Sequence, residues 1–403
     1  MKRTKFHVDR RRFLATSAAA TFGAISARVW AGQPSVPEYL REYAALYRKD
    51  PHAAAIEWFR NAKFGLFMHY GLYSLLGGEW QGKMVTTGKG NSNLVAEWIQ
   101  FHARIPVAEY AKLADRFTAE RFDADFITDL AIAAGMKYVN ITTRHHDSFC
   151  LFRTKQTDFN SLNTPARRDL VAELADACRR KGLGLFLYYS HGRDWRHPHA
   201  PTLAWCGNAR PHYESPQPEY IPDDQVDVRI YADFMEKQIT ELLTQYGPIA
   251  GIWLDGEGVL KSYAAATGRP LSEVCELMRV PQLYATIRRL QPQCLISYKR
   301  GVNGDEDFLT PERKSFGLEH SGKPLEINTT LQQHSWGYNK YSKLKSFDEI
   351  WNTLALARSL PACLLLNTGP LGDGSIRPAE ERMLRDVGRR IRKEGWPTAP
   401  NVG

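Results

Sequence analysis

Short apolar runs alternate with longer amphipathic stretches along most of the chain. Apolar runs of about four to eight residues, bounded by glycine or polar residues, are typical of strands buried on both faces. Such runs, with the polar residues that end them, lie at 63–69, 136–147, 182–190, 251–255, 294–299, 325–328 and 363–367. The stretches predicted to be helical or rich in helix lie at 36–60, 94–135, 168–181, 225–247, 271–291, 346–359 and 378–394.

Strands that alternate with helices predict a parallel sheet. About seven predicted strands end in polar residues, and this repetition favours a closed barrel over a doubly wound sheet. No glycine-rich phosphate-binding fingerprint follows the first strand, which argues against a nucleotide-binding fold. We therefore expect a (β/α)8-like, TIM-type barrel that occupies residues 36–397 as the catalytic domain.

Residues 1–31 have the pattern of a twin-arginine signal peptide. The run from Asp9 to Leu14 (DRRRFL) precedes a mildly apolar, alanine-rich stretch, and Val29-Trp30-Ala31 offers a small-x-small cleavage site. The stretch is too short and too weakly apolar for a transmembrane helix, and no cysteine lies near the cleavage site. We expect export to the periplasm or the medium without a membrane anchor.

This leader accounts for most of the positive charge of the chain. The net charge is +9, of which residues 1–31 carry +6, so about +3 is left for the remainder. No run rich in lysine or arginine follows the leader, and no nucleic-acid partner is therefore expected.

Polar residues at the predicted strand ends would share one rim of the barrel, where (β/α) barrels place their chemistry. These residues are His69, His145, His146, Tyr189, Asp255, Lys299 or Arg300, and Asn367. The loops add Glu79, Glu97, Glu306, Glu312 and Trp336. Together they predict a polar cup with aromatic walls.

Three chemistries use such residues. A metal site needs ligands that converge, but the adjacent His145 and His146 diverge in an extended segment, and no H-x-H pair ends a strand. A serine nucleophile would need a Gly-x-Ser-x-Gly elbow, which the sequence lacks. Glycoside hydrolysis needs two carboxyl groups: Asp255 suits the ionised nucleophile, and a glutamate between 304 and 312 suits the acid. Neither a metal nor a cofactor is expected.

Several segments together resemble the family 29 glycoside hydrolases, the α-L-fucosidases. The similar segments are 63–71, 143–152, 188–195, 251–256, 334–339 and 364–373. They include a first strand that ends in histidine, a paired-histidine motif and a nucleophile motif, in the order of the family. The resemblance covers about residues 55–392.

The resemblance implies a retaining exo-α-L-fucosidase that removes terminal α-L-fucosyl residues from fucosylated oligosaccharides or glycoconjugates. Asp255 would attack the anomeric carbon, Glu312 would act as the acid/base, and Glu306 is its alternative. The implied substrate-binding residues are His69, Glu79, Trp80, Glu97, Trp98, His145, His146, Tyr189, Trp253, Arg300 and Trp336. Glu79-Trp80 and Glu97-Trp98 both resemble a Glu-Trp motif of the family.

The chain departs from the family pattern at Tyr70, where tryptophan is usual, and at Arg144, where lysine is usual. The sequence stops at residue 403, soon after the last predicted helix, so no appended C-terminal β-sandwich is expected. Two other functions stay open. One is hydrolysis of another sugar such as an α-L-galactoside, and the other is carbohydrate binding without catalysis.

Overall fold

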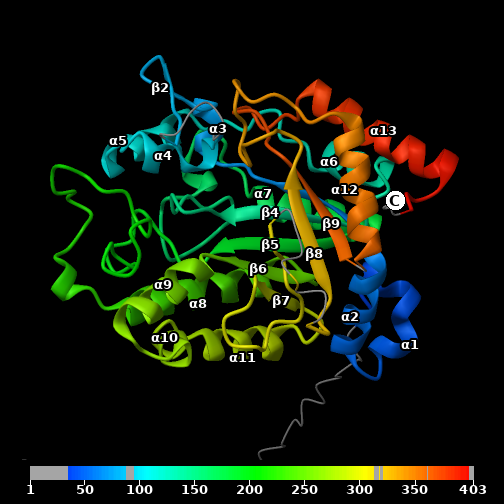
Figure 1. Cartoon of the computed structure of the whole chain (residues 1–403), viewed down its shortest axis with the longest axis horizontal. Helices are drawn as coiled ribbons and strands as arrows, with labels where there is room; N and C mark the ends of the chain where they lie inside the picture. The colour runs from blue at the N-terminus through cyan, green and yellow to red at the C-terminus, as the bar shows by residue number, and fades with distance from the viewer. Residues whose placement is uncertain (1–34, 88–94, 313–316, 318–320, 361, 399–403) are drawn as a thin grey trace, which may run out of the picture. The chain divides into compact units, whose positions relative to one another are not determined.

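Seven parallel strands form the central sheet of the computed structural model, which describes residues 35–87, 95–312, 317, 321–360 and 362–398. In sheet order they are β7 (Leu295–Tyr298), β6 (Gly251–Asp255), β5 (Gly184–Ser190), β4 (Tyr138–Arg144), β1 (Phe64–Met68), β9 (Ala362–Thr368) and β8 (Leu325–Thr330). All six neighbouring pairs are parallel. Figure 1 shows these strands side by side at the centre of the fold. The predicted leader, residues 1–31, lies outside the described residues.

Residues 307–312, which we call the closing segment, connect the two edges of this sheet. The Asp307 and Thr310 amides donate to β7 and to the residue after it, at Ile296 O (2.7 Å) and Lys299 O (2.8 Å). On the other side, Leu309 exchanges backbone hydrogen bonds with Pro324 and Glu326 at 3.0 and 2.9 Å. The predicted barrel is thus confirmed, and the closing segment, which lies outside the named strands, links β7 to β8 through isolated backbone contacts.

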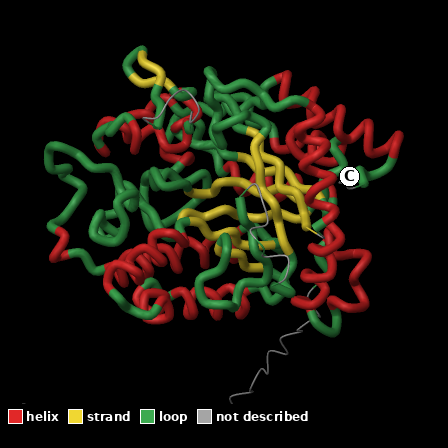
Figure 2. Tube along the Cα trace, viewed as in Figure 1, coloured by secondary structure: helices red, strands yellow, loops and turns green. Residues whose placement is uncertain are grey.

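Helices cover the outside of the barrel, as Figures 1 and 2 show. They include α6 (Ala124–Ala133), α7 (Leu170–Lys181), α8 (Val228–Gln245), α9 (Glu257–Thr267), α11 (Val280–Leu290), α12 (Phe347–Ser359) and α13 (Pro378–Glu394). Asp123, Asp169 and Asp227 accept backbone N–H bonds at the starts of α6, α7 and α8, which satisfies donors that a helix leaves unpaired. No helix in the described part of the chain is long and apolar enough to cross a membrane.

Other elements precede the barrel or lie in its loops. They are α1 (Ala44–Tyr47), α2 (Pro51–Ala62), α3 (Tyr73–Leu76), α4 (Ile99–His102), α5 (Val107–Ala111), α10 (Leu271–Leu277) and the hairpin of β2 (Glu79–Trp80) with β3 (Lys83–Met84). Among the described residues after β9, the last helix or strand is α13, and no β-sandwich is present.

Aromatic side chains fill the barrel at the end where the strands begin. Trp58 of α2 stacks on Phe186 of β5 at 6.2 Å between ring centroids. Glycines at the strand starts make room for these rings: a Cβ at Gly184 would lie 2.4 Å from the Trp58 ring, and one at Gly251 would lie 2.3 Å from Phe186. Such distances are too short for real contacts, so this end of the barrel is packed solid and leaves the other end for chemistry.

Candidate active site

The carboxyl ends of the barrel strands surround a cavity of about 660 Å³. Strand ends, the closing segment and the loops that follow the strands all contribute to its walls. Its lining includes Phe67, His69, Glu97, Trp98, His145, His146, Tyr188, Arg193, Trp253, Asp255, Lys299, Arg300, Glu312, His334 and Trp336. Charged and aromatic side chains thus share one concave site, as expected for the active end of such a barrel.

Asp255, the last residue of β6, lies in the wall of this cavity and is largely buried. Its Oδ2 accepts a 2.7 Å hydrogen bond from the Tyr188 hydroxyl, and its Oδ1 accepts a 2.6 Å bond from the Gly256 amide. Burial opposes ionisation, but the Lys299 ammonium, the Arg193 guanidinium and the Tyr188 hydrogen bond outweigh it and lower the pKa of Asp255. The carboxyl group is therefore a fixed anion at neutral pH.

A second carboxyl group shares a cation with Asp255. The Lys299 ammonium lies 3.2 Å from Asp255 Oδ1 and also contacts Glu312 Oε1. Glu312 ends the closing segment and faces Asn328 of the neighbouring β8. Its side chain is 44% exposed, against 12% for Asp255. One carboxylate is therefore held rigidly in the wall, and the other stands at the open edge of the cavity.

The three histidines of the rim are buried and uncharged. Burial lowers the pKa of His69 to about 3 and moves the pKa values of His145 and His146 well below the usual range. His69 Nδ1 lies 2.7 Å from Asn367 Oδ1, whose amide nitrogen donates to Trp336 O. Because the amide oxygen only accepts, Nδ1 of His69 carries the proton and Nε2 is left as an acceptor.

The same reasoning assigns His146. Its Nδ1 lies 2.6 Å from Ser190 Oγ, which itself donates to Arg193 O at 2.7 Å. The serine oxygen therefore accepts from His146 Nδ1, and Nε2 of His146 is an acceptor 3.8 Å from Asp255 Oδ2. His145 stacks on Tyr188 at 5.4 Å, and its Nδ1 has no hydrogen-bond partner among the described residues.

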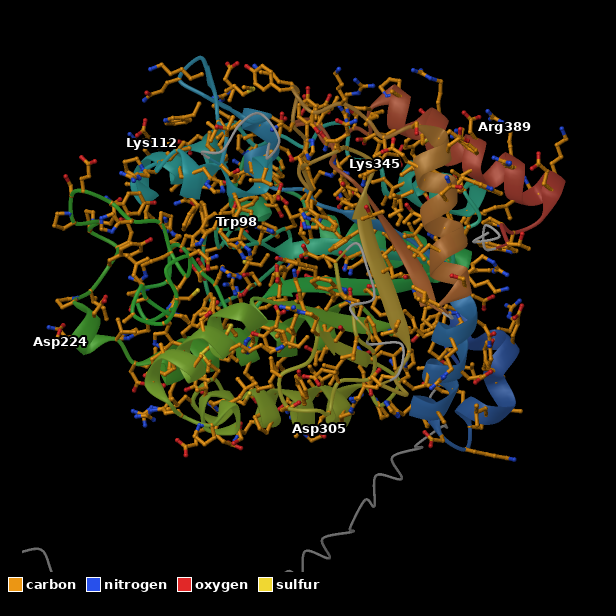
Figure 3. The ribbon with its side chains drawn as sticks, viewed as in Figure 1. Trp98, Lys112, Asp224, Asp305, Lys345 and Arg389 are labelled. Atoms are coloured by element: carbon orange, nitrogen blue, oxygen red, sulfur yellow. The ribbon has the colours of Figure 1, made fainter. Side chains whose placement is uncertain are left out.

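Glu97 forms another wall of the cavity, beside Trp98. Glu97 Oε2 accepts the amides of Trp336 and Gly337 at 3.2 and 2.9 Å. Burial raises the pKa of Glu97 to about 7, although these backbone donors oppose the shift. Its second oxygen, Oε1, is buried and pairs with none of the described groups. Trp98, labelled in Figure 3, lies 5.1 Å from the His146 ring.

This site agrees with the comparisons with known proteins. The family profile described as Alpha-L-fucosidase matches residues 36–396. The chain belongs to the α-L-fucosidase family. The family predicted from the sequence motifs is thereby confirmed, and with it the class of glycoside hydrolases.

Individual relatives and solved structures agree with this assignment. The tissue α-L-fucosidase of Bos taurus is 28% identical over 365 residues, which are 89% of this chain and 71% of that protein. A putative α-L-fucosidase of Caenorhabditis elegans is 25% identical over 83% of this chain and 64% of its own length. The chain thus spans about two thirds of these relatives. The unliganded α-L-fucosidase AlfC from Lactobacillus casei has a TM-score of 0.70 and 30% identity, over 84% of this chain and 98% of that one.

The structure of this α-L-fucosidase family member brings most of the predicted site residues together, but it places four elsewhere. Glu79 ion-pairs with Lys340 at 2.6 Å on the β2–β3 hairpin, and neither it nor Trp80 lines the cavity. Of the two similar Glu-Trp pairs, Glu97-Trp98 is therefore the one in the site.

Glu306 is also outside the cavity, because it caps its own loop. Its carboxylate accepts the Val302 and Gly304 amides at 2.8 and 3.1 Å and the Tyr284 hydroxyl at 3.1 Å. The neighbouring Asp305 lies well apart from Trp98 in Figure 3. Arg300 does line the cavity, where it donates to Glu257 at 3.2 Å.

Tyr189 is the fourth residue outside the cavity, and strand alternation explains why. In β5, Gly184, Phe186 and Tyr188 point into the barrel, so Tyr189 points outward. Its hydroxyl donates to Gln238 at 2.6 Å, and the Arg144 guanidinium lies 4.6 Å above its ring. The predicted placement of Tyr189 in the pocket was wrong, and Tyr188 lies there instead.

Tyr188 was absent from our predicted site residues and Lys299 was named only as an alternative to Arg300, while Arg193 and His334 were also absent; all four line the cavity. Alternation could have found the first two. It directs Leu295, Ser297 and Lys299 inward from β7, just as it selects Tyr188 over Tyr189. Arg193 and His334 lie on loops with no regular period, so alternation could not identify them, although both fall within the family-like segments 188–195 and 334–339.

Exchanging each tyrosine for phenylalanine tests this assignment. Because the Tyr188 hydroxyl orients the Asp255 carboxylate, we expect Tyr188→Phe to lower kcat on an aryl α-L-fucoside by about 10- to 100-fold. Tyr189→Phe removes only a core hydrogen bond, so it should lower the melting temperature and leave kcat within about threefold. Steady-state kinetics and thermal melts distinguish the two, and an equal loss of kcat in both variants would contradict the assignment.

Proposed function

We propose that the protein is a retaining exo-α-L-fucosidase, with Asp255 as the nucleophile and Glu312 as the acid/base. The observation that carries this proposal is the contact of both carboxylates with the Lys299 ammonium at the rim of one cavity. Two oxygens that contact the same nitrogen lie at most roughly 6 Å apart. Retaining glycosidases hold their carboxyl groups at about 5–5.5 Å, whereas inverting ones need about 6.5–9.5 Å to admit a water.

The two environments suit the two roles in this proposal. Asp255 is fixed by Tyr188 and Gly256 and is ionised, as an attacking carboxylate must be. Glu312 lies at the open edge, where the leaving group of a bound fucoside would extend toward solvent. In the first step the Asp255 oxygen bonds to the anomeric carbon, the glycosidic C–O bond breaks, and Glu312 gives its proton to the departing oxygen.

The unpaired polar atoms of the walls support a sugar ligand. Glu97 Oε1 and His145 Nδ1 are buried without partners among the described residues, and Nε2 of His69 and of His146 are acceptors. Buried polar atoms are normally satisfied, so these await the hydroxyl groups of a ligand. Trp253, Trp336 and Phe67 provide apolar surface for a ring face and a methyl group.

The structural relatives point to fucose as that sugar. The Lactobacillus casei AlfC has been solved in complex with α-L-fucose product and, as its D200A mutant, with Fuca(1,6)GlcNAc. We infer that this chain likewise acts on fucosylated oligosaccharides or glycoconjugates. The pattern of residues 1–31 extends the proposal to export by the twin-arginine pathway. Fractionation of producing cells tests export, and an enzyme confined to the cytoplasm would contradict it.

Hydrolysis of paired aryl substrates tests the sugar and the stereochemistry. We expect release from an aryl α-L-fucoside, with kcat/KM about 10- to 200-fold above that for the α-L-galactoside, because the latter adds a hydroxyl where fucose has a methyl group. NMR of the first-formed sugar should show α-L-fucose. A preference for the galactoside would contradict fucose as the substrate, and a β product would indicate an inverting mechanism. If neither substrate were hydrolysed, a non-catalytic carbohydrate-binding protein would be favoured.

A further inference from the structure

Lys299 is held in the cavity by an uncommon backbone conformation. It follows β7 directly and has φ +51°, a left-handed value that side-chain-bearing residues rarely adopt. Its carbonyl accepts the Thr310 amide of the closing segment at 2.8 Å. The same peptide framework therefore fixes both the lysine and the segment that ends in Glu312. Non-glycine residues in such conformations persist where the surrounding structure imposes them, often at functional sites.

The ammonium of Lys299 connects two carboxylates that no backbone contact joins. It contacts Asp255 on β6 and Glu312 on the closing segment, and it lies 5.5 Å above the Trp253 ring. The two neighbouring guanidinium groups have other contacts, since Arg193 donates to Asn208 and Arg300 donates to Glu257. The titratable and charged groups around the ammonium are Asp255, Glu312, Glu257, His69, His145, His146, Arg193 and Arg300.

The proposed reaction moves one negative charge between these two carboxyl groups. When the Asp255 oxygen bonds to the anomeric carbon, Asp255 loses its charge, and Glu312 gains one by giving its proton to the leaving oxygen. In the second step Glu312 takes a proton from water, the water oxygen bonds to the anomeric carbon, and the bond to Asp255 breaks. The charge thereby returns to Asp255. An ammonium in contact with both groups has one anionic partner at each stage.

We propose that Lys299 is a positioning residue that serves as a shared counter-ion for Asp255 and Glu312 and sets the pH range in which the pair holds a single proton. This inference rests on the proposed glycosidase function. It deepens that function, because a cation in contact with a carboxyl pair favours the loss of a proton from the pair, which then passes through its singly protonated form at lower pH. The buried Asp255, whose pKa Lys299 helps to lower, is consistent with this effect.

Variants of Lys299 test the proposal through the pH profile. In Lys299→Met and Lys299→Gln, the alkaline limb of kcat/KM on an aryl α-L-fucoside should move up by about one pH unit, because a carboxyl group without the cation keeps its proton longer. Lys299→Arg retains the charge and should keep the limb within about 0.3 units. Melting curves and circular dichroism establish that each variant is folded, and glutamine provides the readout if methionine does not fold.

Lys181 offers a matched control on the outside of the barrel. Its ammonium also contacts two carboxylates, Asp129 at 2.6 Å and Asp125 at 3.1 Å. Lys181→Met should keep the wild-type pH profile. Suppose that the wild type hydrolyses the fucoside but the alkaline limb of folded Lys299→Met or Lys299→Gln stays at the wild-type pH. The counter-ion role is then overturned and the fucosidase function stands. The same conclusion follows if Lys299→Arg moves the limb as far as Lys299→Met does. A wild-type protein that hydrolyses no fucoside overturns both.

Discussion

Replacing Asp255 with glycine is expected to lower kcat on an aryl α-L-fucoside by on the order of 10⁴-fold, because the glycosyl-enzyme ester can no longer form. The small side chain leaves space beside the anomeric carbon, where azide could attack in place of the lost carboxylate. We expect azide to restore turnover and to yield β-L-fucosyl azide, the inverted product. Steady-state kinetics and NMR of the product measure both effects.

A control for this variant comes from an aspartate remote from the cavity. Asp305→Gly changes an exposed loop residue and should keep kcat near the wild-type value. If Asp255→Gly retained more than about a tenth of the wild-type kcat, a residue other than Asp255 would be the nucleophile. Azide that accelerates a folded Asp255→Gly but yields the α-azide would equally contradict direct replacement of the carboxylate.

The loss caused by Glu312→Ala is expected to depend on the leaving group. General acid catalysis contributes about 10²- to 10⁴-fold when the departing oxygen needs a proton. We therefore expect kcat/KM to fall by about 10³-fold for a fucosylated disaccharide and by only a few-fold for 2,4-dinitrophenyl α-L-fucoside. Azide should now intercept the intermediate on Asp255 and give the α-azide, which retains the starting configuration.

Glu306→Gln is the matched control for Glu312→Ala, since Glu306 was the alternative acid/base predicted from the sequence. Glutamine can still accept hydrogen bonds from the loop amides that Glu306 caps. Activity on the disaccharide should remain within about threefold of the wild type. Equal losses on both leaving groups in Glu312→Ala, or a leaving-group dependence that appears only in Glu306→Gln, would move the acid role away from Glu312.

The strands of the barrel could be predicted from the sequence, but the closing segment that joins β7 to β8 could not. The seven paired strands have apolar runs that period and composition reveal, whereas the closing segment is short, begins with Asp307 and contains Pro311 before Glu312. It pairs at single positions with β8 and connects to β7 through scattered hydrogen bonds. Such a segment has no strand-like pattern, because its place is fixed by the two edges that it joins.

The direction of the site residues on strands could likewise be predicted from the sequence, and that of the residues on loops could not. His69, Asp255 and Trp253 lie on strands or at strand ends, where alternation fixes the direction of each side chain. The choice of Tyr189 over Tyr188 failed because alternation along β5 directs Tyr188, and not Tyr189, into the cavity. The pairs Glu79-Trp80 and Glu97-Trp98 are identical Glu-Trp dipeptides, so the sequence cannot distinguish them. Only the tertiary structure shows that Glu97 contacts Trp336 in the site.

The closing segment also constrains how this chain can change over evolutionary time. Because successive side chains of an extended segment point to opposite sides, inserting or deleting one residue between Phe308 and Glu312 would turn the carboxylate out of the barrel. Gly304 and Asp305, just before this segment, are exposed, so we expect length variation to be tolerated there without a change in the register of the sheet. Descendants of this chain should therefore differ in loop length on the N-terminal side of residue 307 and keep the spacing from 308 to 312.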